Sequence, residues 1–100
     1  MTGAEGKPRV RIDYCAKCRF LARAAWMAQE LLTTFAEELG AVTLAPGDGG
    51  VFQVRLATAA GDELIACRAR DGGFPELAAL KRAIRDRVAP ARELGHSERA

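Results

Sequence analysis

Hydrophobic and polar residues alternate at the start of the chain and then repeat at a longer period. In residues 9–14 every second side chain is apolar and the others are charged, which predicts a strand with one buried face. In residues 18–39 apolar residues recur every three or four positions, which predicts an amphipathic helix that ends before Gly40. The apolar positions of this helix are Leu21, Ala24, Ala25, Ala28, Leu31, Leu32, Phe35 and Leu39.

The second half of the chain predicts three further strands and a second helix. The strands cover residues 41–45, 51–57 and 63–70, and the short link at residues 58–62 predicts a hairpin between the last two. The second helix begins with Pro75 in its first turn. Its apolar stripe is Leu77, Leu80, Ile84 and Val88, and its polar face, expected in solvent, carries Lys81, Arg82, Arg85 and Arg87.

The order strand, helix, strand, strand, strand, helix predicts an α/β fold. The first strand–helix–strand unit should be a right-handed parallel crossover, and the later strands should add an antiparallel hairpin. Because the strands alternate, only one face of the mixed four-stranded sheet should be covered, with both helices on that face. This two-layer sandwich is the minimal thioredoxin-like arrangement. We expect residues 1–100 to form a single domain, with flexible ends at residues 1–8 and 89–100.

Composition limits the possible functions. The chain has 100 residues, of which 49% are hydrophobic and 28% charged, with a net charge of +2, so we expect a soluble globular domain that binds neither nucleic acid nor membrane. No apolar run approaches the ~20 residues of a membrane span, and residues 1–8 lack the apolar centre of a secretory signal. Three cysteines, an odd number, indicate a reducing, cytoplasmic location rather than a structural disulfide framework.

The segment Cys15-Ala16-Lys17-Cys18 lies between the first strand and the first helix. A Cys-x-x-Cys pair can close a disulfide within one helical turn, and the positive end of a helix dipole favours the thiolate. Lys17 and Arg19 add positive charge with the same effect. Because the thiolate is the form that attacks a disulfide, we predict Cys15 and Cys18 as the catalytic pair of a thiol-disulfide oxidoreductase.

The cysteine pair has two other possible uses. A zinc site needs about four ligands, and the other soft candidates, Cys67 and His96, form no second compact pair, so we expect no metal. The second alternative is a redox-sensitive interaction module, in which oxidation changes a binding surface around the Cys loop, Trp26 and Phe74 without turnover. Cys67 itself is interpreted as a small buried hydrophobe or as the partner of a transient disulfide.

The sequence Gly72-Gly73-Phe74-Pro75-Glu76 precedes the second helix. It can be a tight turn and helix start, or an anion site in which backbone N–H groups receive a carboxylate. Glutaredoxins resemble it, since they place a Gly-Gly turn before their last helix to hold a glutathione carboxylate. Together with the residues between the cysteines, this turn supplies the substrate-binding candidates, which are Ala16, Lys17, Gly72, Gly73 and Phe74.

Five segments together resemble one family, the bacterial selenoprotein W-like members of the SelT/SelW/SelH group. They are residues 14–18, 23–32, 46–52, 70–76 and 94–97, within a resemblance that covers about residues 10–98. The resemblance implies a thioredoxin-like fold and an antioxidant thiol redox role linked to glutathione or thioredoxin. It implies no resident cofactor, with glutathione as co-substrate or protein thiols and disulfides as partners. We expect a monomer or a weak homodimer.

The resemblance leaves the attacking sulfur open. In the animal selenoproteins the position of Cys18 is selenocysteine, whereas thioredoxins attack with the cysteine that corresponds to Cys15. Helix geometry favours Cys15 as the more exposed sulfur. Thioredoxins also carry a cis-proline directly before the strand that faces the motif, whereas Pro46 here precedes the next strand by several residues, which argues against thioredoxin-style peptide docking.

Overall fold

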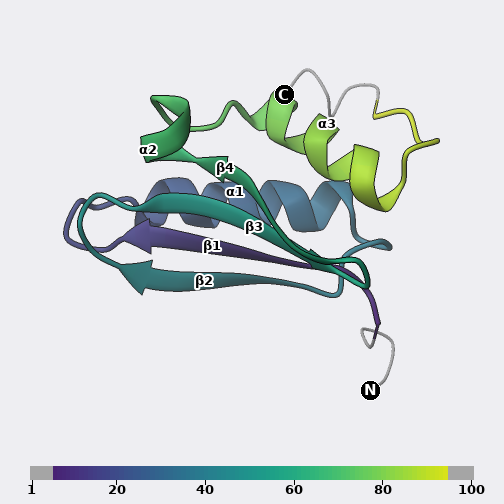
Figure 1. Ribbon diagram of the computed structural model, residues 1–100, viewed down its shortest axis with the longest axis horizontal. Helices are drawn as coiled ribbons and strands as arrows, with labels where there is room; N and C mark the ends of the chain where they lie inside the picture. The colour runs from purple at the N-terminus through teal and green to yellow at the C-terminus, as the bar shows by residue number, and fades with distance from the viewer. Residues whose placement is uncertain (1–5, 95–100) are drawn as a thin grey trace.

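A four-stranded mixed sheet forms one layer of the protein, in a computed structural model that describes residues 6–94. Its strands are β1 (Arg9–Cys15), β2 (Ala41–Gly47), β3 (Phe52–Thr58) and β4 (Gly61–Cys67), in the order β2-β1-β3-β4 (Figure 1). Strands β1 and β2 are parallel, while β3 runs antiparallel to both β1 and β4. The predicted crossover, hairpin and thioredoxin-like fold class are therefore confirmed.

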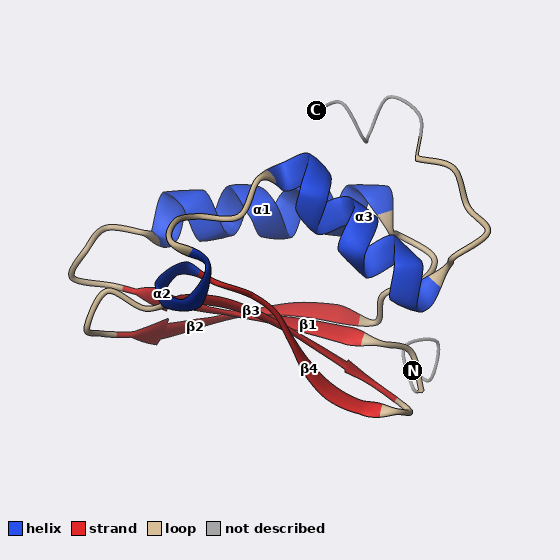
Figure 2. Ribbon diagram, turned by 45° about the horizontal axis from the view of Figure 1, so that its top comes forward, coloured by secondary structure: helices blue, strands red, loops and turns tan. Residues whose placement is uncertain are grey.

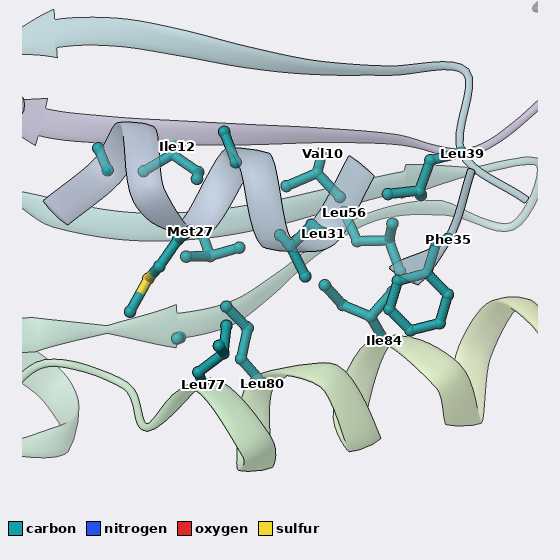
Figure 3. Packing of buried hydrophobic residues seen from close by; sticks show 14 of the residues in the cluster. Val10, Ile12, Met27, Leu31, Phe35, Leu39, Leu56, Leu77, Leu80 and Ile84 are labelled. Atoms are coloured by element: carbon teal, nitrogen blue, oxygen red, sulfur yellow. The ribbon is translucent and has the colours of Figure 1, made fainter. Parts of the chain in front are cut away.

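Two helices, α1 (Leu21–Thr34) and α3 (Leu77–Val88), cover the same face of this sheet (Figure 2). A third, one-turn helix, α2 (Arg68–Asp71), follows β4 directly and was not predicted. The side chains between the layers form the core, and Figure 3 shows α1 and α3 directing theirs toward each other and toward the sheet. Its most buried large members are Phe35, Phe52, Ile12, Met27, Leu31, Leu56 and Ile84.

The alternation of β1 decides which face meets the helices. Val10 and Ile12 are 1% and 0% exposed, whereas Arg9 and Arg11 lie on the open face. Fully burying a side chain such as isoleucine is worth about 1.5–3 kcal/mol, so a shift of register by one residue would lose this gain and bury charges instead.

The first helix is shorter than the predicted range of residues 18–39. Arg19 has a φ of 64°, a left-handed conformation that an α-helix cannot contain, so the helix begins only at Leu21. At the other end Phe35 leaves helical geometry, although it remains in the core. Three predicted stripe residues are exposed, namely Leu21 (49%), Leu32 (43%) and Ala25, and Met27 is buried instead.

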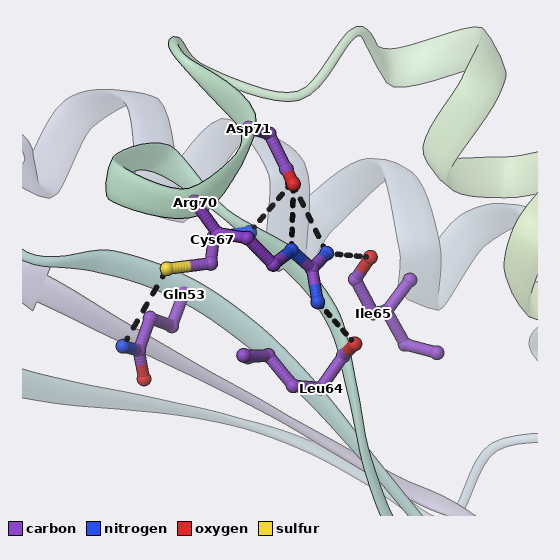
Figure 4. Close-up of polar contacts among 6 residues, drawn as sticks. All are labelled: Gln53, Leu64, Ile65, Cys67, Arg70 and Asp71. Carbon is purple, nitrogen blue, oxygen red and sulfur yellow. Dashed lines mark hydrogen bonds and ion pairs between the residues drawn. The ribbon is translucent and has the colours of Figure 1, made fainter.

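The last strand was predicted over residues 63–70 but ends at Cys67. Oδ2 of Asp71 accepts a hydrogen bond from the Cys67 N–H (2.9 Å), which turns the chain into α2. The guanidinium of Arg70 then donates to the carbonyl oxygens of Leu64 and Ile65, as Figure 4 shows. Arg70 therefore covers backbone acceptors along β4, which is the kind of protection that edge strands need.

The second predicted helix starts two residues later than expected, because Pro75 precedes the N-cap residue Glu76. The expected apolar stripe is confirmed, with Leu77, Leu80 and Ile84 buried and Val88 half-buried. The expectation that the basic residues all face solvent is wrong for Lys81, which is 1% exposed.

Beyond α3, Leu94 packs into the core. The expectation of flexible ends covered residues 1–8 and 89–100. Of these, residues 1–5 and 95–100 lie outside the described residues. Within residues 6–94, none of the helices is both long enough and apolar enough to span a bilayer.

Candidate functional site

Cys15 and Cys18 are joined by a disulfide at the carboxyl end of β1. Their Cα atoms are 5.3 Å apart, within the usual range for a disulfide. The loop that connects β2 to β3 holds the first cysteine in place, because the Cys15 N–H donates to the Val51 carbonyl at 2.8 Å and the Ala16 N–H donates to Gly47 at 3.1 Å. The sheet therefore positions the pair through backbone bonds on two sides.

The two sulfurs differ in their access to solvent. Cys15 is 1% exposed at the end of β1, whereas Cys18 is exposed in the loop outside. The expectation that Cys15 is the more exposed cysteine is therefore wrong. The Cys18 N–H donates to Sγ of Cys15 at 3.3 Å, so the buried sulfur has a backbone donor directed at it. An incoming reactant can reach Cys18 and not Cys15.

The turn after the motif, rather than a helix start, sets the direction of Cys18. The Arg19 N–H donates to the Ala16 carbonyl at 3.1 Å, and the Phe20 N–H donates to the Cys15 carbonyl at 3.3 Å. Arg19 takes the left-handed backbone conformation that closes this turn. Cys18 thus lies three residues before the first residue of α1, outside the first turn, where the helix dipole acts most strongly.

Three aromatic rings from three separate segments pack together beside the Cys loop. Phe20, Phe52 and Phe74 are in mutual edge-to-face contact, with ring centroids 4.9 to 6.2 Å apart. Pairs of this kind contribute about 0.5–1.5 kcal/mol beyond their area burial. The cluster therefore holds the loop before α3, through Phe74, against Phe20, the second residue after the cysteine motif.

Two guanidinium groups lie over this aromatic cluster. Cζ of Arg23 is 4.0 Å from the centroid of Phe74, and Cζ of Arg68 is 5.3 Å from the same centroid and 5.4 Å from that of Phe20. Arg68 also donates to the Gly50 carbonyl at 3.4 Å. In the part of the chain that the structure describes, neither arginine forms an ion pair with a carboxylate. Their positive charge is thus available beside the site.

The structure brings together most of the predicted substrate-binding residues. Ala16 and Lys17 are exposed in the Cys loop, and Phe74 contacts Phe20 just after it. The N–H groups of Gly72 and Gly73, however, both donate to the Arg68 carbonyl, at 3.0 and 3.1 Å, and so cap α2. Gly72 can close this cap because its φ of 80° costs a glycine little. A carboxylate beside Phe74 would therefore meet guanidinium groups rather than these amides.

Sequence reasoning missed Arg23 and Arg68. Arg23 lies in the predicted first helix and opens one of the segments that resemble the family, but it was assigned no role, and Arg68 was assigned to a strand that in fact ends before it. The spacing in the sequence gives no signal for either, because their proximity depends on how α1 and α2 pack around Phe74.

The third cysteine, Cys67, is not part of the disulfide. Cys67 is a buried free cysteine, 8% exposed, and its sulfur accepts a hydrogen bond from Nε2 of Gln53 at 3.8 Å (Figure 4). Among residues 6–94 no three His, Cys, Asp or Glu side chains gather as a metal site would require. His96 lies outside the described residues.

A shallow hollow of about 700 Å³ lies on the open face of the sheet. Arg11, Arg55 and Asp48 are among its lining residues, while neither cysteine of the pair contributes to it. The hollow thus borders Gly47 and Val51, which accept the backbone hydrogen bonds of the Cys loop, but neither sulfur lines it.

Comparison with known proteins agrees with this geometry. Residues 9–86 match the Rdx family. A crystal structure of a Bordetella parapertussis protein is 50% identical, covers 82% of this chain and 99% of its own, and has a TM-score of 0.75. A selenoprotein W-related protein from Vibrio cholerae is 41% identical, with coverage of 80% and 95% and a TM-score of 0.74. No curated protein matches. The chain therefore belongs to the selenoprotein W-related Rdx family.

Proposed function

We propose that this protein is a thiol-disulfide oxidoreductase in which Cys18 attacks and Cys15 resolves. The observation that carries the proposal is the asymmetry of the pair, since an exposed Cys18 is bonded to a Cys15 that is 1% exposed. A sulfur that solvent cannot reach cannot make the first contact with a partner, but it can displace a partner already bound to its neighbour.

The chemistry is two consecutive exchanges. The Cys18 thiolate attacks one sulfur of a disulfide RS–SR, forms a mixed disulfide and releases RS⁻. The Cys15 thiolate then attacks Sγ of Cys18, closes the intramolecular disulfide and releases the second RS⁻. The protein loses two electrons, the substrate gains them, and an external thiol reductant restores the dithiol by the reverse exchanges.

The surroundings of the loop support the proposal. Lys17 and Arg19 flank Cys18 in the sequence, and Arg23 and Arg68 lie over the aromatic cluster that follows it. Positive charge near a cysteine favours the thiolate over the thiol. The backbone donor directed at Sγ of Cys15 would stabilise that sulfur as a leaving group when the disulfide is reduced.

Glutathione or a protein thiol is the proposed reductant, in the cytoplasm and in an antioxidant role. This part of the proposal follows from the family resemblance. The reaction itself needs no resident cofactor, because the two sulfurs carry the electrons. The substrate-binding role of the loop residues and the monomeric or weakly dimeric state stay predictions.

Trapping of partners tests the order of the two cysteines. In the Cys15→Ser variant, Cys18 can still attack, but the mixed disulfide is not resolved, so we expect covalent adducts with glutathione disulfide and with lysate proteins. The Cys18→Ser variant leaves only the buried sulfur and should form far fewer. Both variants should carry Cys67→Ser, so that the third thiol contributes nothing. Adducts on Cys15 alone, or on neither cysteine, would overturn the proposal.

The exposed residues of α1 favour a second candidate, a redox-sensitive interaction module. Trp26 is 46% exposed, and Leu21 and Leu32 are exposed on the same helix. A turnover assay separates the two functions. Repeated reduction of a disulfide in the presence of a recycling thiol supports the oxidoreductase, while a single stoichiometric oxidation with changed partner affinity supports the module.

A further inference from the structure

We infer that Arg23 and Arg68 bind a carboxylate beside the disulfide, so that the protein selects disulfide substrates with negative charge close to the sulfur. The inference rests on the proposed function and names its substrate class. Two observations support it. Both guanidinium groups lie at the end of the sheet that carries Cys18, and no carboxylate of the described residues pairs with either of them.

Side-chain contacts place the two arginines at the cysteine end of the sheet. Arg68 contacts Phe20, which is two residues from Cys18, and donates to Gly50, whose neighbour Val51 accepts the bond from Cys15. Arg23 reaches the same cluster from the first turn of α1, through Phe74. A substrate bonded to Cys18 would therefore extend over, or beside, the rings that these arginines flank.

The guanidinium groups are oriented before any ligand arrives. Both lie against the ring of Phe74, at 4.0 and 5.3 Å from its centroid. A guanidinium held over an aromatic ring keeps N–H donors at its rim for a carboxylate, although Nη1 of Arg68 already donates to the Gly50 carbonyl. Holding the group in place also reduces the conformational entropy that binding would otherwise cost. Arginine is suited to this task because its planar donors match two carboxylate oxygens.

The nearest acidic group on α2 does not neutralise Arg68. Asp71 accepts hydrogen bonds from Nε of Arg70 at 2.6 Å, from Nη2 of Arg70 at 3.2 Å and from the Cys67 N–H at 2.9 Å. Its two oxygens are thus committed to closing β4 and to Arg70. This arrangement leaves Arg68 as a cation without a carboxylate partner among residues 6–94.

Charge selectivity can be measured with three small symmetrical disulfides. The probes are dithiodiglycolate, which is anionic, hydroxyethyl disulfide, which is neutral, and cystamine, which is cationic. The reduced protein is mixed with each, quenched with an alkylating agent, and analysed by mass spectrometry for formation of the Cys15–Cys18 disulfide. Each rate is divided by that of mercaptoethanol with the same probe, which removes the intrinsic reactivity of the disulfide.

We expect the normalised rates to fall from dithiodiglycolate to hydroxyethyl disulfide to cystamine. Arg23→Gln and Arg68→Gln should each slow the anionic probe roughly two- to fivefold more than the neutral probe, the range for exposed ion pairs, because a change in the thiolate fraction of Cys18 affects all probes equally. Arg23→Lys should retain most of the preference. Arg55→Gln is the matched control, because it removes the same charge from an exposed arginine on the open face of the sheet. In the strand register Arg55 lies opposite Arg11, which is four residues before Cys15 in β1.

The outcomes separate this inference from the proposed function. Equal normalised rates for the three probes would overturn the inference alone, as would an equal loss for all three probes in both Gln variants. If none of the disulfides oxidises the reduced protein, the proposed function itself fails, and the inference fails with it.

Discussion

The ammonium group of Lys81 lies 3.0 Å from Oε1 of Glu30, and this ion pair joins α3 to α1. The lysine is 1% exposed, whereas the side chain of Glu30 is 32% exposed. A charge that is removed from water is costly unless a partner compensates it. The pair therefore allows a basic residue to occupy a core position between the two helices.

Glu30→Gln should destabilise the fold. It removes the carboxylate that lies against the buried ammonium group of Lys81, and we expect a loss of about 2 kcal/mol, below the ~3–5 kcal/mol of a fully buried pair because water screens Glu30. Lys81→Met should be close to neutral, since it replaces the charge by an apolar chain of similar size. Urea unfolding measures both, with Glu37→Gln, an exposed glutamate, as control. Equal stability of the two Gln variants would contradict this account of Lys81.

The backbone of Arg19 predicts opposite effects for two substitutions. Its φ of 64° costs a side chain with a Cβ about 1–2 kcal/mol, and glycine avoids that cost but loses more entropy on folding. Arg19→Gly should therefore be neutral or stabilising by up to about 1 kcal/mol, whereas β-branched Arg19→Val should destabilise by more than about 1 kcal/mol. Urea unfolding of the oxidised forms measures this difference. If Arg19→Val is as stable as Arg19→Gly, the loop does not need the left-handed conformation.

Acid should weaken the fold through two carboxylates. A hydrogen bond from Arg70 is the main cause that lowers the pKa of Asp71 below its ordinary 3.8, and one from Arg87 lowers the pKa of Glu63 below 4.5. A carboxyl whose pKa is lower in the folded state stabilises the protein above its unfolded pKa. That contribution is lost as the pH falls through the folded pKa.

We therefore expect the stability of the wild type to fall below about pH 4, where these carboxyl groups begin to be protonated. The double variant Glu63→Gln/Asp71→Asn should be less stable at neutral pH and should lose less on acidification. Urea unfolding across this range at low salt measures both slopes. Identical slopes for the two proteins would show that these ion pairs do not contribute to acid sensitivity.

Local patterns in the sequence predicted the elements that depend on one face being buried. The alternation in residues 9–14 and the stripe of Leu77, Leu80 and Ile84 appear in the structure as expected, because a strand or helix that covers a core must place apolar side chains at its own period. The ends of elements were less predictable. Arg19 delays α1 and Asp71 ends β4 through backbone geometry and a single hydrogen bond, which no hydrophobic period records.

The sequence by itself determined the cysteine pair, the order of the four strands and the two long helices, and the α/β class, since these follow from spacing and periodicity along the chain. Only the tertiary structure decided that Cys15 is buried and Cys18 exposed, that Arg23 and Arg68 share the ring of Phe74, and that Lys81 reaches Glu30. Each of these relationships joins segments that are distant in sequence, or depends on which side of a turn a residue takes. They are fixed by packing of the helices on the sheet, and no local pattern encodes such contacts.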